Sequence, residues 1–389
     1  MALGSVLTAS STLGEKAKAL VPLVDASAAF ADEQGQLAPD LVEAMHRDGL
    51  FNMWLPAVLG GAELDPVSSI EVVENLAYGD ASAAWVQMAA SLSVGTGGAY
   101  LGESAAKELF DDDKRTVIAG QGTRPGTAVP ADGGYLLSGS WSFASGIKHG
   151  THIHTLAIIT TTGEPRIFVL PVEQVNLIDN WDVLGLRGTG SIDYTIENVF
   201  VPEEYSHFAI AADAKQGGSL YNIGIIGFAQ IGHSGWALGL GRRLLDELAA
   251  LVQDKAGRPG TQADNAAFLE GFARAEAQLR AARAFVYEAW RDVTATIDTG
   301  EHPSVRQHTL TRLALTNATA ALSDVANFVY LAGGTTALRR GTIQRMVRDV
   351  HAGTQHVTSS PAVVQNCGRE LAGLASDKMW VFLDLAPTH

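Results

Sequence analysis

One long apolar stripe near the C-terminal end constrains the fold of this chain more than any other feature. Apolar residues recur in steps of three and four from Phe268 to Ile297, which is the spacing of one face of an α-helix that Asp264 can cap. At about 1.5 Å per residue, this helix would be on the order of 50 Å long. Gly300 ends the pattern, and a second stripe runs from Leu310 to Phe328. Two long helices joined by a short connection predict a four-helix bundle.

The rest of the chain consists of two further parts that differ in the spacing of their apolar residues. Its 389 residues are too many for one hydrophobic core and indicate two or three domains. Helical spacing dominates before about residue 115, whereas short β-rich runs separated by Gly, Pro, Asn and Asp follow up to about residue 212. We expect an α+β chain that is mainly α, with an N-terminal helical domain (1–115), a central β-barrel or β-sandwich domain (116–212) and a C-terminal four-helix bundle (213–389).

Charge and cysteine content exclude several classes of function. The 27 basic and 42 acidic residues give a net charge of −15, which argues against binding nucleic acid or an anionic membrane. A single cysteine, Cys367, excludes an internal disulfide framework and a cysteine-built zinc site. No apolar run is long enough for a transmembrane helix, and no basic segment precedes an apolar stretch at the N-terminus. We expect a cytoplasmic oligomer.

Other common catalytic motifs are absent or incomplete. There is no P-loop, and the glycine-rich run from Gly185 to Gly190 lacks the strand and helix that would flank a dinucleotide-binding turn. In the run from Gly232 to Gly235, the second glycine comes one residue too early for a serine-hydrolase elbow. His152 and His154 have no nearby carboxylate that would complete a metal triad, so we expect no metal site.

Five short motifs instead follow one another in order along nearly the whole chain. They are Leu50 to Gly61 with its Pro56 and Gly60-Gly61, Thr123-Arg124-Pro125-Gly126, the run Gly139 to Gly146, Leu331-Ala332-Gly333-Gly334, and Arg348-Asp349. As a set they resemble the acyl-CoA dehydrogenase superfamily. Its members share the helical, β and helical order expected above, so the resemblance implies an acyl-CoA dehydrogenase-like fold.

The segment after Arg348-Asp349 departs from the dehydrogenase pattern. Acyl-CoA dehydrogenases carry a glutamate a few residues beyond this pair, which removes a substrate proton, but residues 351–359 contain no carboxylate here. Some members of the superfamily take the base from another helix. One hypothesis is therefore an acyl-CoA dehydrogenase or oxidase with a relocated base. Another is a catalytically inactive binding protein that kept the fold.

Three features are similar to the superfamily's two-component flavin-dependent monooxygenases, of the hydroxyphenylacetate hydroxylase and dibenzothiophene monooxygenase kind. These features are the helix Asp80 to Trp85, the Trp-x-x-x-Ser-Gly shape of Trp141 to Gly146, and His356 at the position of a catalytic histidine. The resemblance implies that FMNH2 or FADH2 reacts with O2, through a C4a-hydroperoxyflavin, to hydroxylate a small aromatic or heteroaromatic substrate. Because the chain has no NAD(P)H site, a separate flavin reductase would supply the reduced flavin.

The resemblance also implies roles for individual residues. The Ser145 hydroxyl would bond flavin N5 without being a base strong enough to remove its proton. His356 would orient or protonate the peroxide, because imidazole titrates near working pH. Trp141 would offer a broad face to the isoalloxazine ring, and Thr123 would bond the pyrimidine edge.

The remaining expected site residues concern the far half of the flavin and the substrate. Arg258 lies where dehydrogenases place an arginine on the cofactor of the neighbouring subunit, and Gly333 and Gly334 belong to a family cofactor motif. That motif has Tyr330 in place of a glutamine and lacks its third glycine, so FMN and FAD both stay open. The resemblance implies a homotetramer. The expected substrate-binding residues are Trp85, Gln121 and Ile225.

Overall fold

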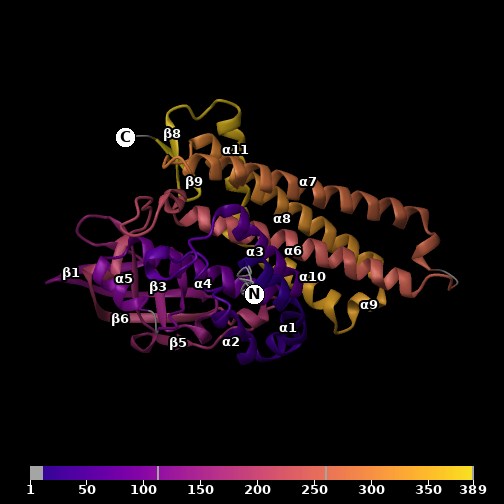
Figure 1. The fold of residues 1–389 in the computed structure, drawn as a ribbon, viewed down its shortest axis with the longest axis horizontal. Coiled ribbons are helices and arrows are strands. Elements are labelled where there is room, and N and C mark those ends of the chain that lie inside the picture. The colour runs from indigo at the N-terminus through magenta and orange to yellow at the C-terminus, as the bar shows by residue number, and fades with distance from the viewer. Residues whose placement is uncertain (1–11, 112–113, 259–260, 388–389) are drawn as a thin grey trace, which may run out of the picture.

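The computed structural model describes residues 12–111, 114–258 and 261–387. Figure 1 shows three neighbouring parts, with a sheet at one end of the molecule and long helices extending away from it. The N-terminal part is helical and consists of α1 (Leu13–Gln34), α2 (Pro39–Arg47), α3 (Pro66–Gly79), α4 (Ala81–Tyr100) and α5 (Glu103–Leu109). The changes from helix to strand and back fall near the domain boundaries that we propose at residues 115 and 212.

Capping residues determine where these first helices begin. The hydroxyl of Thr12 accepts from the Glu15 amide and the Glu15 carboxylate accepts from the Thr12 amide, which makes a capping box for α1. Asp65 caps α3 through the Ser68 amide. Asp80 caps α4 in the same way through the Ala83 amide, and the small residues of this helix let it pack tightly on all sides.

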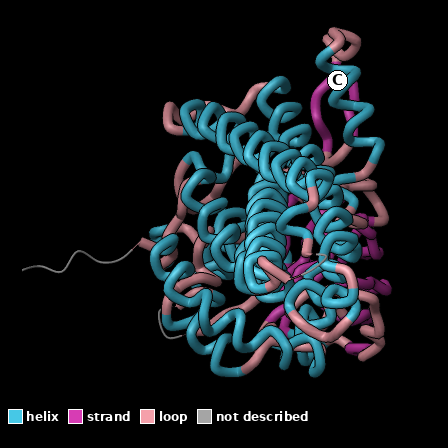
Figure 2. The backbone as a smooth tube through the Cα atoms, turned by 90° about the vertical axis from the view of Figure 1, so that its right-hand side faces the viewer, coloured by secondary structure: helices cyan, strands magenta, loops and turns pink. Residues whose placement is uncertain are grey.

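The central part forms a sheet that, within the described residues, has seven strands in the order β5-β6-β2-β1-β3-β4-β7. Figure 2 shows the strands gathered on one side of the helices. The β1–β3 pair is parallel and the other pairs are antiparallel. The strands are β1 (Ile118–Ala131), β2 (Gly134–Ala144), β3 (His152–Ile159), β4 (Pro165–Pro171), β5 (Asn176–Ile178), β6 (Ile192–Pro202) and β7 (Ser206–Phe208).

The sheet contains two irregularities that bear on the site. In β1 the register with β3 shifts between Gln121 and Gly126, so the family motif that begins at Thr123 is a bulge inside a strand and not a loop. In β2 the register with β6 shifts between Trp141 and Ala144. Phe143, within that shift, has a φ of 70°, a left-handed conformation that reverses the normal alternation of side chains.

The C-terminal part is built around three long helices, and the predicted apolar stripes are buried in their core. Asn265 caps α7 in place of the expected Asp264, which lies in a short 3-10 turn before it. Most of the apolar window of α6 is buried inside the protein, although by length and composition the segment could cross a membrane. The helices are α6 (Gly224–Asp254), α7 (Ala266–Ile297), α8 (Val305–Gly333), α9 (Thr335–Leu338), α10 (Thr342–Gly353) and α11 (Pro361–Leu371).

A C-terminal hairpin, β8 (Lys378–Val381) and β9 (Asp384–Pro387), follows the bundle. Trp380 Nε1 donates to Thr309 Oγ1 at 2.9 Å, and the Arg312 guanidinium lies 4.2 Å from the Trp380 ring centroid. These contacts attach the hairpin to the start of α8.

Candidate active site

Trp85, on α4, lies where the N-terminal helices, the sheet and the bundle meet. Asp80 begins α4 by accepting from the Ala83 amide at 3.0 Å, which fixes the helix one turn before Trp85. Trp85 Nε1 donates to Ser145 Oγ at 3.2 Å, immediately after β2. Two predicted site residues that are distant in sequence therefore contact each other directly.

Two imidazoles also pack against the Trp85 ring. The ring centroid of Trp85 lies 4.7 Å from that of His233 and 5.6 Å from that of His356. The His233 and His356 centroids are 4.1 Å apart, and Trp236 on α6 packs edge-on against Trp85 at 5.2 Å. His233 comes from the middle of α6 and His356 from the turn after α10, so this cluster requires the whole fold.

Both imidazoles are neutral near pH 7. Burial lowers the pKa of His356 to about 4, and burial together with the neighbouring His356 holds the pKa of His233 well below its ordinary value. Among the described residues, neither ring pairs with a carboxylate, which would have favoured the charged form. The site therefore offers uncharged nitrogen donors and acceptors, and no carboxylate base of the dehydrogenase kind contacts the two rings.

The tautomer of His356 follows from its neighbours. The Thr358 backbone N–H can only donate, and it faces His356 Nδ1 at 3.5 Å, while the Thr358 hydroxyl lies 2.8 Å from the same nitrogen. Nδ1 is therefore the acceptor, and in the neutral ring the proton resides on Nε2. No described residue bonds Nε2, so this N–H is available to a bound molecule.

A row of hydroxyl groups lies behind Ser145. Its Oγ is 2.7 Å from Ser191 Oγ, which is 2.6 Å from Thr189 Oγ1. Thr189 Oγ1 donates to the Leu186 carbonyl at 2.8 Å, and all three hydroxyl-bearing residues are buried. Leu186 has a left-handed φ of 54°, and its amide donates to the Asp349 carboxylate at 2.6 Å.

Asp349 and Asp80 are buried acids that support this arrangement. Burial raises the pKa of Asp349 to about 7 and that of Asp80 to about 6; the nearby Asp80 carboxylate adds to the rise at Asp349, and Asp32 adds to the rise at Asp80. Arg345 Nε lies 3.6 Å from Asp80, and Arg348 pairs with Asp32 at 2.8 Å. The Arg348-Asp349 motif of the sequence thus anchors α10 to the Leu186 turn and to α1 and does not contact the imidazoles.

The structure places Trp141 away from this cluster. Its ring is fully buried in the core of the sheet, where it stacks on Tyr194 with centroids 5.2 Å apart, and Nε1 donates to the Leu156 carbonyl. The β2 bulge exposes Phe143 instead, at 63% of its surface, with the Trp181 ring edge-on at 6.0 Å. The Trp141 ring therefore has no open face for a flavin, and the exposed aromatic surface here belongs to Phe143.

The other expected substrate and flavin residues lie around the edges of the cluster or outside it. Gln121 lies in the β1 bulge, where its side-chain oxygen accepts from the Arg124 amide at 2.9 Å. Ile225 is buried at the start of α6, about two turns before His233 on the same helix. The backbone of Thr123 belongs to β1, and its side chain lies outside the described residues.

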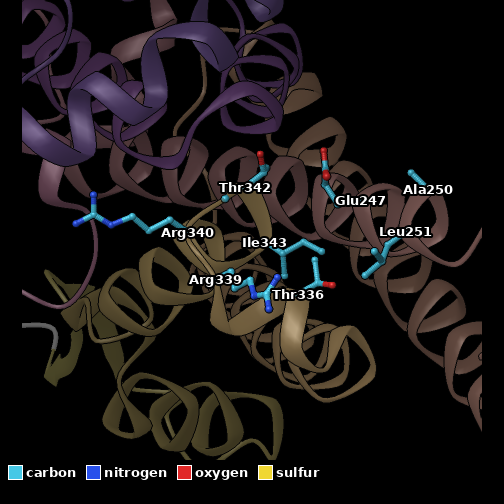
Figure 3. A pocket seen from close by; sticks show the side chains of 9 residues that line it. Glu247, Ala250, Leu251, Thr336, Arg339, Arg340, Thr342 and Ile343 are labelled. Carbon is cyan, nitrogen blue, oxygen red and sulfur yellow. The ribbon is translucent and has the colours of Figure 1, made fainter. Parts of the chain in front are cut away.

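Arg258, Gly333 and Gly334 gather at the opposite end of the bundle. Arg258 is exposed and pairs with Asp254 at the end of α6, about 30 Å along that helix from His233. Lys255 Nζ donates to Thr336 Oγ1 at 3.2 Å, which brings this turn next to the end of α8. A cavity of about 410 Å³ lies here, with Arg339 and Arg340 on its α9–α10 side and Glu247 and Leu251 on its α6 side (Figure 3). One chain therefore does not bring these residues to Ser145 and His356.

Sequence reasoning missed His233, Ser191 and Phe143. His233 had a weak signal, since it is a polar residue three positions before Trp236 in an apolar helix. Ser191 had none, because only the turn that ends at Leu186 and Thr189 brings its hydroxyl to Ser145. The exposure of Phe143 depends on a strand bulge that pairing with β6 creates.

Comparison with known proteins identifies the family. The chain matches the family model for the acyl-CoA dehydrogenase N-terminal domain over residues 17–110 and the model for the acyl-CoA dehydrogenase C-terminal domain over residues 231–361. The indole-3-acetate monooxygenase of Pseudomonas putida is 30% identical over 356 residues, which cover 88% of this chain and 89% of that protein. The oxygenase subunit HsaA of a flavin-dependent monooxygenase from Mycobacterium tuberculosis is 26% identical over 375 residues, covering 88% of this chain and 90% of its own length.

A solved structure shows the same fold. The 3-HSA hydroxylase from Rhodococcus sp. RHA1 superposes with a TM-score of 0.89 at 23% identity, covering 96% of this chain and 99% of the other. The expected helical, β and helical architecture is thereby confirmed along almost the whole length. The chain belongs to the acyl-CoA dehydrogenase superfamily, in its branch of flavin-dependent monooxygenases that serve as the oxygenase components of two-component systems.

Proposed function

We propose that this flavin-dependent oxygenase hydroxylates a small aromatic or heteroaromatic compound at the cluster of Trp85, Ser145, His233 and His356. The observation that carries the proposal is the pair of neutral imidazoles packed against Trp85, which itself packs edge-on against Trp236, with no described carboxylate in contact with either imidazole. Aromatic walls with few polar groups suit a flat, weakly polar substrate. The name of the Pseudomonas putida relative, an indole-3-acetate monooxygenase, supports a substrate of indole size.

The residues around Ser145 fit an isoalloxazine ring. Phe143 presents an exposed aromatic face two residues before Ser145, and Gly146 has a left-handed φ of 79°. A Cβ at Gly146 would lie 2.9 Å from Val86, so only glycine lets the turn approach α4 this closely. We assign Phe143, rather than Trp141, as the aromatic contact of the flavin, with Ser145 at its N5 and Thr123 at its pyrimidine edge.

When bound, reduced flavin supplies the electrons that activate O2. His356 Nε2–H would donate a hydrogen bond to oxygen, and the low pKa keeps the ring from becoming a cation that releases its proton to water. His233 would keep the adjacent side of His356 dry and neutral, since a second charge 4.1 Å away would be unfavourable. Trp85 and Trp236 would exclude water from the substrate.

We also propose that Arg258, Gly333 and Gly334 serve the flavin of a neighbouring chain in a cytoplasmic homotetramer. This proposal is supported by the separation of these three residues from Ser145 along the bundle, and by the Arg339 and Arg340 cations beside the cavity.

If these residues hold the adenine half of FAD, Arg258→Ala should weaken FADH2 binding about tenfold and leave FMNH2 binding unchanged, because FMN lacks that half. Anaerobic equilibrium dialysis with both flavins measures this. Equal losses for both flavins, or none for either, would contradict the assignment.

The function itself is tested with labelled oxygen. The purified chain is mixed anaerobically with chemically reduced FMN or FAD and indole-3-acetate, and then exposed to ¹⁸O₂. We expect product containing one ¹⁸O atom and less hydrogen peroxide than free reduced flavin generates. Complete conversion of O2 to peroxide with a panel of small aromatics would count against the proposal. Bleaching of bound oxidised FAD by an acyl-CoA would favour the dehydrogenase alternative, and failure to bind either flavin would favour an inactive scaffold.

A further inference from the structure

The hydroxyl row behind Ser145 has a fixed direction. It runs from Trp85 Nε1 to Ser145, Ser191 and Thr189, and ends at the Leu186 carbonyl, with every link between 2.6 and 3.2 Å. Each hydroxyl has one proton to donate, so the groups at the two ends decide which way all three protons point. An indole N–H can only donate, and a carbonyl oxygen can only accept.

The direction can be derived from the carbonyl end. Thr189 donates its proton to the Leu186 oxygen at 2.8 Å, so its own oxygen must accept from Ser191. Ser191 has then used its proton and must accept from Ser145. The Leu186 oxygen also receives the Trp181 Nε1–H at 3.1 Å and the Thr189 amide at 3.2 Å, and the hydroxyl is the nearest of the three donors.

The other end agrees with this direction. Trp85 Nε1–H donates to Ser145 Oγ, which occupies one of its two lone pairs, while its proton is directed to Ser191. One lone pair of Ser145 remains for a bound molecule. We propose that Ser191 and Thr189 are positioning residues that make Ser145 a hydrogen-bond acceptor only, so that this site selects reduced over oxidised flavin.

The selection follows from flavin chemistry and rests on the proposed function. Reduced flavin carries a proton on N5, which an acceptor at Ser145 can bind, whereas N5 of oxidised flavin is itself an acceptor and faces a lone pair. The row is protected from water, because Ser145, Thr189 and Ser191 are each less than a tenth exposed. Asp349 holds its far end by bonding the Leu186 amide at 2.6 Å, which keeps the carbonyl turned towards Thr189.

The experiment measures affinity for the two redox states and needs no turnover. Oxidised FMN and FAD, and the same flavins reduced by dithionite, are titrated anaerobically into the wild-type chain and into Ser191→Ala and Thr189→Val. Either substitution frees the Ser145 proton to donate to oxidised flavin. We expect the preference for the reduced form to fall about tenfold, the worth of one hydrogen bond, mainly through tighter binding of oxidised flavin. The two-electron midpoint potential of bound flavin should fall by about 30 mV.

Thr189→Ser keeps the hydroxyl and is the matched control, with a wild-type ratio expected. Two variants that break the row at different links guard against one of them failing to fold, which circular dichroism checks. If the wild type prefers reduced flavin and both variants keep that ratio, the inference is overturned while the proposed function stands. If the wild type binds neither redox state of flavin, the inference and the proposed function are both overturned. A general loosening of the site would weaken both forms equally, and that result also overturns the inference.

Discussion

His356→Ala is expected to lower the formation of hydroxylated product by roughly 10²- to 10⁴-fold, the range associated with losing a positioned proton donor. The Nδ1 atom of His356 is held by Thr358, so the ring presents Nε2–H in a fixed direction beside Trp85. Alanine removes that donor and opens space for water against the flavin. Oxygen consumption should continue, with hydrogen peroxide replacing product, as measured by product chromatography and a peroxide assay on the same sample.

Two further variants make this result specific. His356→Gln retains an amide N–H donor and should recover part of the coupling. His351→Ala, on the exposed face of α10, should behave as the wild type. If His356→Ala couples oxygen to product as well as the wild type, His356 has no place in the site. The same assay on His233→Ala tests the neighbouring imidazole, which should show a smaller rise in peroxide because it supports His356.

The second large effect is a steep loss of stability in mild acid. Burial lowers the pKa of His356, His149, His207 and His308 to about 4 and that of His154 to about 3, and it holds that of His233 well below the ordinary value. Unfolding exposes these rings, which then take up protons below pH 6.5. Their contribution to stability is therefore present above about pH 6.5 and is lost as the pH falls towards 4.

The two buried acids act in the opposite direction. Because folding raises the pKa values of Asp80 and Asp349 from 3.8 to about 6 and 7, their contribution is present below about pH 4 and is lost as the pH rises from there through 6 to 7. The six imidazoles named above outweigh these two carboxyls, which by themselves leave a net uptake of about four protons on unfolding near pH 5.5. The free energy of unfolding should then fall by roughly 5 kcal/mol per pH unit, comparable with the whole stability of many domains.

Urea unfolding followed by circular dichroism at pH 7.5, 6.5 and 5.5 measures this slope. His308→Gln, whose side chain lies outside the proposed site, should reduce the slope by about one proton. His351→Gln should leave it unchanged, because that side chain is exposed in the fold. A midpoint that stays constant from pH 7.5 to 5.5 would show that the buried imidazoles do not titrate on unfolding.

The sequence alone determined the order of helices, strands and bundle, because helical and strand spacing are local properties that each segment carries by itself. The stripe from Phe268 to Ile297 is an example, since those residues are buried on one face of α7 as expected. Motifs in order also determined the family, and they selected Trp85, Ser145 and His356, which the structure brings together.

Only the tertiary structure decided which neighbours those residues have. A bulge with a left-handed Phe143 exposes that phenyl ring two residues after the buried Trp141, and the bulge depends on pairing between β2 and β6. His233 meets His356 because α6 crosses α4 at Trp85, and Ser191 reaches Ser145 because Asp349 holds the Leu186 turn. These contacts join residues far apart along the chain, so no local spacing of residues encodes them. The direction of the hydroxyl protons is likewise set only in the folded protein, because folding brings the three hydroxyl groups and the Leu186 carbonyl together.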